Sequence, residues 1–258
     1  MVKFTKLFSL VERGTEARQL SENPQLMGPF GWFEWGAICV MAFGLMVMNF
    51  LGDPTVYIWM TNRFNWISQT YWELGHLLFW VCACVLGYVA LPVCYLMLSG
   101  RRLSDYYLGV SGSIEHARVY LIILFPISLI VFWVSYWSSF QEIYPFYTLA
   151  GRSLFDLVVW ELAYGVQFAS LEFFFRAFML ESLRKSLGYG SIAFMLIPYC
   201  MIHFQKTFVE SAGSLFAGLL LGFLAMRGRS IWGGVFVHWF VAVEMDLLSL
   251  AQSGRLPW

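Results

Sequence analysis

Charged residues are scarce in this chain. Asp, Glu, Lys and Arg account for 12% of its 258 residues, whereas hydrophobic types account for 59%. Soluble domains carry about twice that share of charge, so the composition excludes an ordinary soluble fold and predicts an integral membrane protein. The 16 basic and 16 acidic residues cancel and no long basic run occurs, so nothing indicates nucleic-acid binding.

Two further features of the sequence restrict the class of protein. The five cysteines all lie in apolar runs, which predicts small core residues rather than a disulfide framework. No secretory signal is expected at the start of the chain, because the apolar piece Leu7–Val11 is short and charged residues follow it.

Long apolar runs, by contrast, fill most of the chain. Seven of them approach the roughly 20 residues that cross a bilayer, although the fifth and sixth are short. They are Trp35–Leu51, Leu77–Leu98, Val119–Trp137, Leu154–Leu180, Ser191–His203, Ser211–Met226 and Ile231–Leu250. We therefore predict an all-α, polytopic membrane protein with about seven transmembrane helices, or eight with a hidden one, in a single domain over residues 1–258.

Two kinds of segment are expected along the membrane surface. Within the N-terminal segment 1–30, the apolar residues of 4–11 recur at helical spacing beside two lysines, which predicts an interfacial helix; a disordered tail is the alternative. Aromatic residues, which favour the headgroup region, cluster between the first two spans and again at Tyr144–Tyr147.

The distribution of basic residues predicts an orientation. With residue 1 taken as cytoplasmic, eleven of the 16 Lys and Arg residues fall in inner segments and four in outer ones. This asymmetry indicates a multi-pass protein with a cytoplasmic N-terminus, in the inner membrane if the source is bacterial.

Ionisable side chains are concentrated in the fourth span. Glu172 and Arg176 are four residues apart and share one helix face, and Glu161, eleven residues earlier, returns to almost the same face. Charges at this depth cost a few kcal/mol even on lenient scales, so they usually face a protein interior or a wet cavity. We therefore expect the rest of the chain to supply partners for this polar stripe.

Two of the four histidines, His203 and His238, lie within or at the end of later spans. At about 1.5 Å per residue they reach a depth similar to that of Glu172, so three helices could bring these side chains to one buried site. A carboxylate beside two imidazoles suits general-base activation of water, and it is also a known set of zinc ligands. The residues leave two alternatives open: a structural network in which Arg176 neutralises Glu172, and a proton relay or transporter.

Three motifs around these residues resemble those of the CPBP family of intramembrane proteases, which includes type II CAAX prenyl endopeptidases and bacteriocin-processing enzymes. The segment Leu171–Arg176 resembles the family's Glu-Glu-x-x-x-Arg, Tyr199–His203 its Phe-x-x-x-His, and His238–Ala242 its His-x-x-x-Asn or His-x-x-x-Asp. The resemblance covers about Trp160–Ala242, inside a family-like core at 154–250.

The resemblance implies hydrolysis of a peptide bond in a membrane-associated substrate. The implied catalytic residues are Glu172 and His203, which would polarise a water molecule, and His238, which would stabilise the developing oxyanion. Arg176 would fix Glu172.

Two positions depart from the family pattern. The first motif Glu, to which water activation is usually assigned, is Leu171, and the motif Asn is Ala242; neither side chain can transfer a proton or donate a hydrogen bond. In one interpretation Glu172 takes over as the base. In another, a displaced acid substitutes: Glu161, which would need a helix break to reach the site, or Asp246, one turn beyond Ala242. In the third, the protein is a catalytically inactive pseudoprotease that binds a membrane substrate or scaffolds a partner.

No cofactor and no tightly bound zinc are expected, because no His-Glu-x-x-His pair fixes two ligands on one helix. If a divalent metal such as zinc does bind, the expected ligands are Glu172, His203 and His238. The expected partners are the lipid bilayer and a membrane-associated peptide or protein substrate, with a membrane-protein partner in the pseudoprotease interpretation.

Overall fold

The structure is a computed structural model that describes residues 28–64, 69–204, 206 and 208–257. Within those residues every regular element is a helix. The interfacial helix predicted at residues 4–11 lies outside the described residues. The all-α prediction is confirmed.

Six helices in the described part of the chain are long and apolar enough to cross a membrane. They are Trp32–Leu51 (α3), Trp72–Leu98 (α5, η3 and α6), Ala117–Val134 (α8), Leu154–Leu187 (α10, η6 and α11), Phe208–Gly228 (α13) and Trp232–Gln252 (α14). This confirms a polytopic membrane protein.

The fifth predicted span is shorter than a membrane crossing. It forms α12, Gly190–Met201, whose 12 residues extend about 18 Å, against the ~30 Å of a bilayer core. The next helix along the chain is α13, and α12 packs against it. The predicted seven spans are therefore six long helices and one short one, and no eighth occurs among the described residues.

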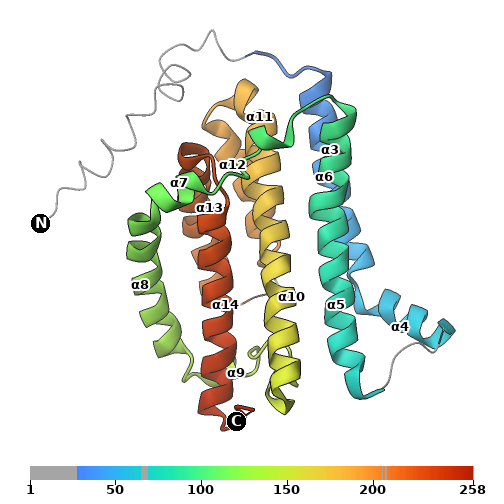
Figure 1. The fold of residues 1–258 in the computed structure, drawn as a ribbon, viewed down its shortest axis with the longest axis vertical. Helices are drawn as coiled ribbons and strands as arrows, with labels where there is room; N and C mark the ends of the chain where they lie inside the picture. The colour runs from blue at the N-terminus through green and yellow to red at the C-terminus, as the bar shows by residue number, and fades with distance from the viewer. Residues whose placement is uncertain (1–27, 65–68, 205, 207, 258) are drawn as a thin grey trace, which may run out of the picture.

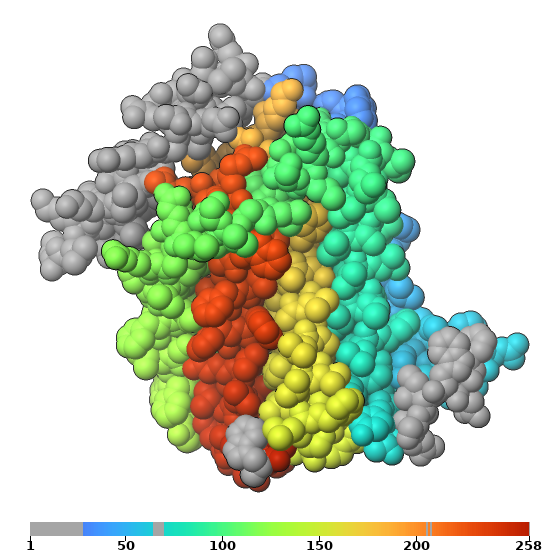
Figure 2. All heavy atoms as spheres, viewed as in Figure 1, coloured from blue at the N-terminus to red at the C-terminus, as the bar shows by residue number. Residues whose placement is uncertain are grey.

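The long helices stand roughly parallel, with α10 and α14 side by side near the middle of Figure 1. The outer neighbour of α14 is α8, and that of α10 is α5, which also contacts α3. Viewed as spheres, α10 and α14 are in contact along most of their length (Figure 2). The two helices that hold Glu172 and His238 are thus direct neighbours.

The molecule has two ends, named here by the short helix that each contains. The α7 end holds α7, Ser111–Glu115, and the α9 end holds α9, Ser138–Gln141. At the α9 end, α4, Pro54–Phe64, projects sideways from the bundle (Figure 1) and exposes Trp59. That direction is the one expected for the predicted interfacial segment between the first two spans.

A π-helical segment, η6 (Phe173–Met179), interrupts the fourth long helix directly after Glu172. All seven of its residues are buried, including Arg176. Such segments are rare and are frequent at functional sites. Here the segment begins at Phe173, inside the motif Leu171–Arg176, and α10 itself runs unbroken from Leu154 to Glu172.

The loop between α8 and α10 packs into the α9 end of the bundle. Tyr144 and Tyr147 are buried, and the Phe146 ring stacks on Trp160 of α10 at 5.7 Å. The aromatic side chains of this segment are therefore packed against α10 by the protein itself, and its expected place at the headgroup level stays a prediction.

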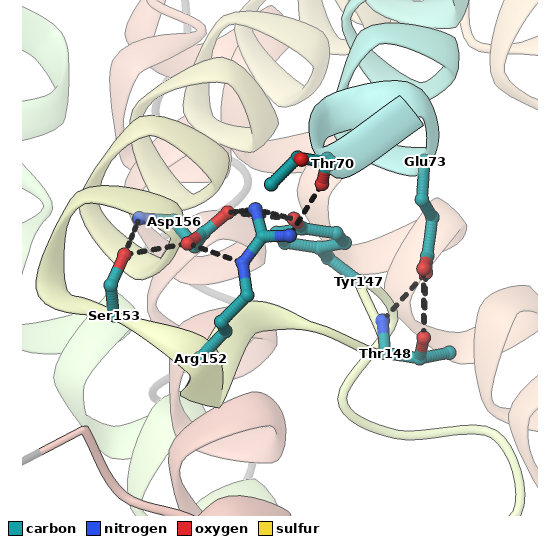
Figure 3. Close-up of polar contacts among 7 residues, drawn as sticks. All are labelled: Thr70, Glu73, Tyr147, Thr148, Arg152, Ser153 and Asp156. Carbon is teal, nitrogen blue, oxygen red and sulfur yellow. Dashed lines mark hydrogen bonds and ion pairs between the residues drawn. The ribbon is translucent and has the colours of Figure 1, made fainter. Parts of the chain in front are cut away.

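Polar contacts anchor the same loop (Figure 3). Asp156, only 1% exposed, accepts hydrogen bonds from the Tyr147 hydroxyl at 2.7 Å and from Arg152 Nε at 3.0 Å. Ser153 caps α10 by accepting from the Asp156 backbone N–H at 3.1 Å. Arg152 also donates to the Thr70 carbonyl, and so joins the loop to the start of α5.

At the α7 end, the Glu181 carboxylate contacts side chains from three segments of the chain. It accepts from the Tyr107 hydroxyl at 2.6 Å and from Arg184 Nε at 2.8 Å, while Arg229 lies 3.9 Å away. Burial, then the neighbouring Glu181 carboxylate, raises the pKa of Tyr107 well above its usual value. This cluster ties the loop before α7 to α11 and to the α13–α14 turn.

Candidate active site

Glu172 is the centre of the candidate site. Its side chain is 1% exposed and lies at the last residue of α10. Arg176, fully buried one turn further on, places Nη1 3.3 Å from Glu172 Oε1. The predicted ion pair on one helix face is therefore present. It neutralises a carboxylate that would otherwise be costly at this depth.

His238, on the neighbouring helix α14, is the second residue that contacts the Glu172 carboxylate. Its Nδ1 lies 2.8 Å from Glu172 Oε1, and its side chain is 18% exposed, so it reaches the edge of the buried site. Phe168, one turn before Glu172 on α10, stacks parallel to the imidazole at 5.7 Å and fixes its plane. The structure thus brings Glu172 and His238 together, as the sequence predicts.

The carboxylate fits against α14 because residue 234 is glycine. A Cβ atom there would lie 2.2 Å from Glu172 Oε2, closer than any non-bonded contact allows. Gly234 lies in the first turn of α14, where backbone N–H groups and the helix dipole favour a negative charge.

Tyr199 connects the remaining groups. Its hydroxyl is 3.0 Å from His238 Nε2, and the guanidinium of Arg176 lies over its ring at 3.8 Å. The side chain is 1% exposed. Sequence reasoning did not assign this residue to the site. The signal was a tyrosine at the position where the family motif has phenylalanine, which adds one hydroxyl to the site.

His203 follows α12 and meets the pair through Tyr199. Its Nδ1 lies 2.8 Å from the Tyr199 carbonyl oxygen, and the two rings pack edge to face at 4.9 Å. A carbonyl oxygen only accepts, so we assign the hydrogen to Nδ1, which leaves the lone pair on Nε2. Within the described residues His203 makes no hydrogen bond or ion pair with Glu172 or His238.

The two departures from the family pattern are both packed in apolar surroundings. Leu171 is 6% exposed and belongs to the cluster that also contains Phe174 and Phe175. Ala242 is 5% exposed and packs in the cluster of Trp160 and Tyr164. Neither position contributes a polar group to the site.

The two displaced acids, Glu161 and Asp246, do not replace the missing residues. Their carboxyl groups interact with each other instead. Glu161 lies eleven residues before Glu172 on the unbroken α10, which is about 16 Å along the axis. Asp246 lies two turns from His238 on α14. The structure therefore offers no route by which Glu161 acts on the same water as His203.

The candidate metal ligands do not fit a metal site. No group of three or more His, Cys, Asp or Glu side chains is placed to hold a metal ion in the described ranges. Glu172 Oε1 already contacts His238 and Arg176, and His203 Nδ1 already contacts a backbone carbonyl oxygen. Glu172, His203 and His238 form no such group in the described residues, and both the conditional set of zinc ligands and the absence of a bound zinc stay predictions.

One comparison with known proteins covers the stretch that contains these residues. The family model of the Rce1-like type II CAAX prenyl endopeptidases matches residues 153–243, about a third of the chain. The match begins at the N-cap of α10 and contains Glu172, Arg176, His203 and His238. It confirms the resemblance to the CPBP proteases, and the chain is a CAAX protease-like membrane protein. Searches of the curated proteins and of the solved structures give no match.

Proposed function

We propose that this protein is an intramembrane endopeptidase that hydrolyses a peptide bond of a membrane-associated substrate, such as a prenylated CAAX-type peptide. The observation that carries the proposal is the contact of His238 with the buried Glu172–Arg176 pair, inside helices that cross the membrane and within the stretch that matches the family model. The excess of basic residues at the α7 end favours a cytoplasmic position for that end.

The hydrogen-bond pattern suggests a division of roles. His203 has its Nδ1 hydrogen directed at a carbonyl, so its Nε2 is the lone pair available to polarise a water molecule. Glu172, held by Arg176, orients His238 rather than acting as the base itself. The imidazole of His238 and the Tyr199 hydroxyl would then stabilise the oxyanion, in the place of the motif Asn.

The direct test is cleavage of a farnesylated CAAX-type peptide by the purified full chain in liposomes. Glu172→Gln, His203→Ala and His238→Ala should each lower the rate by about 10²–10⁴-fold, the usual effect of losing a proton-transfer or orienting group. Glu142→Gln, a neutralised carboxylate on an exposed loop residue, is the matched control and should keep the rate. Undiminished cleavage by all three folded variants overturns the assignment.

The buried Leu171 and Ala242 favour a second candidate, a pseudoprotease that binds a membrane partner. That protein would cleave nothing and would keep its partner on Glu172→Gln. A proton- or ion-coupled transporter, the third candidate, would show flux in liposomes that depends on Glu161 or Glu172. Cleavage that is lost with Glu172→Gln distinguishes the protease from both.

A further inference from the structure

A second pair of acidic side chains is buried between the same two helices, closer to the α9 end. Glu161 of α10 is 9% exposed and Asp246 of α14 is fully buried. Their carboxyl groups face each other closely enough to interact directly. The proposed mechanism does not use either residue.

The two carboxyl groups have unequal surroundings. Asp246 accepts a hydrogen bond from Trp160 Nε1 on one oxygen and from the Phe146 backbone N–H on the other, both at 2.9 Å. Apart from Asp246, neither oxygen of Glu161 has a hydrogen-bond partner in the described part of the chain. Asp246 is therefore surrounded by donors, and Glu161 is not.

The other charged and titratable groups that face the pair come from four parts of the chain. Lys206, on the turn between α12 and α13, interacts with Asp246 and also with Glu210 of α13. Its ammonium lies over the Phe146 ring at 4.4 Å and the Tyr144 ring at 5.3 Å. Tyr144 donates to Glu210 at 2.7 Å. Tyr164 of α10 completes the set. The single cation near the pair is on the Asp246 side.

A hydrogen bond between two carboxyl groups needs a proton, because two carboxylates have no donor. Two ionised carboxylates that face each other would also repel strongly in a low-dielectric interior. Asp246, with two N–H donors and an ammonium nearby, is the group suited to the negative charge. Glu161, with no other partner, is the group suited to keep the proton.

We propose that Glu161 and Asp246 form a proton-binding site, in which Glu161 holds one proton and donates it to the ionised Asp246. The site acts as a latch for the α9 end. Asp246 holds the backbone of Phe146, whose ring is stacked on Trp160 at 5.7 Å, Tyr164 at 5.6 Å and Trp80 at 5.9 Å. Loss of the proton places two repelling charges in the α10–α14 interface and loosens this loop. The proposal does not depend on the proposed function.

Infrared spectroscopy of the purified full chain tests the proton directly. The wild type at neutral pH should show the C=O stretching band of a buried protonated carboxyl, and Glu161→Gln should lose the intensity of one such group. Glu142→Gln, which changes an exposed carboxylate, should leave the band unchanged. A Glu161→Gln spectrum identical to the wild type in this region overturns the proposal.

The pH dependence of the wild-type melting temperature is a second test of the bound proton. The wild-type melting temperature should fall by several degrees as the pH rises from the range in which an unfolded glutamic acid loses its proton to the pH at which the infrared band disappears. In that window the folded protein holds the Glu161 proton and the unfolded chain does not, so the stability falls; above it the melting temperature should level off. Glu161→Gln, a neutral donor of similar shape, should remove this pH dependence. A wild-type melting temperature that stays constant over the pH range in which the band is present refutes the latch.

A metal cation is the other occupant that two carboxylates could take. Melting temperatures at alkaline pH are compared in sodium and in choline chloride at equal ionic strength. Equal values support the proton site. A higher melting temperature in sodium, without a protonated-carboxyl band at any pH, overturns it in favour of a cation site.

Discussion

His238 Nδ1 and Glu172 Oε1 lie 2.8 Å apart across the interface of α14 and α10, 66 positions apart in the sequence. The contact joins the first and third family-like motifs, and the Tyr199 hydroxyl on His238 Nε2 joins the second. Each of these residues is therefore positioned by another motif. Changes that leave the polar residues in place but shift one of them should impair the site.

Gly234→Ala is the substitution that tests this positioning most directly. Glycine to alanine in a helix is normally stabilising by up to about 1 kcal/mol. Here the new Cβ would lie 2.2 Å from Glu172 Oε2 and would push the carboxylate away from His238. We expect at least a roughly tenfold loss of cleavage and a loss of about 1–3 kcal/mol in the free energy of unfolding.

Gly213→Ala is the control for that experiment. It places the same methyl group on α13, where nothing lies within 4 Å. The melting temperature and the cleavage rate should be unchanged or slightly raised. Equal effects of the two substitutions would contradict the specific contact with Glu172.

Tyr199→Phe separates the hydroxyl from the ring. The variant keeps the aromatic face under Arg176 and restores the family's residue, but it removes the partner of His238 Nε2. Loss of such a hydrogen bond costs about 0.5–1.5 kcal/mol, which corresponds to a fall of up to about tenfold in kcat if the hydroxyl contributes to the transition state. We expect that fall with KM unchanged, measured by steady-state cleavage.

Tyr88→Phe is the matched control, because the Tyr88 hydroxyl is buried and has no hydrogen-bond partner among the described residues. Its removal should be neutral or stabilising, with full activity. If Tyr199→Phe also leaves kcat unchanged, the hydroxyl of Tyr199 has no role in the reaction.

The sequence predicted the membrane scaffold and the Glu172–Arg176 pair because both depend on local information: apolar length for the spans, and a spacing of four for the pair. It also placed His238 correctly, since depth along two helices can be estimated from residue counts. The role of Tyr199 was missed because a buried tyrosine in an apolar run is normally part of the core. Only the fold shows that its hydroxyl, ring face and carbonyl contact three different site residues.

The partners of Glu161 and Asp246 could not be predicted from spacing. Each was considered as a substitute for a motif residue nearby in its own helix, whereas the fold pairs them across the helix interface. The burial of Tyr144 and Tyr147 was missed for a similar reason. Aromatic residues in a loop favour the headgroup region unless a groove between helices accepts them, and that groove is a tertiary feature.

Metal removal should not affect the proposed cleavage. Glu172 is occupied by His238 and Arg176, and no three-ligand group exists in the described residues, so the proposed chemistry uses side chains alone. Dialysis of the purified protein against a chelator should leave the cleavage rate unchanged, and added zinc should not raise it. Activity that is lost on dialysis and restored by zinc would require a rearranged site.

The last prediction concerns the anchor of the α8–α10 loop. Asp156 is 1% exposed, accepts hydrogen bonds from three side chains and pairs with Arg152 at 2.5 Å. Asp156→Asn keeps the shape but removes the charge and turns one acceptor into a donor, so one hydroxyl group and one N–H of Arg152 lose their acceptor. Breaking one partner of a buried pair costs about 3–5 kcal/mol, and since Arg152 is partly exposed we expect about 2–3 kcal/mol here.

Thermal or denaturant unfolding of the full chain in detergent measures that loss, with Asp53→Asn as the control. Asp53 is exposed and caps only the nearby Thr55, so its substitution should change the free energy of unfolding by less than about 0.5 kcal/mol. Because the Glu172 site lies more than two turns further along α10, the folded Asp156→Asn protein should keep its KM. A variant that unfolds like the wild type would show that the loop is held by the aromatic stacking of Phe146 alone.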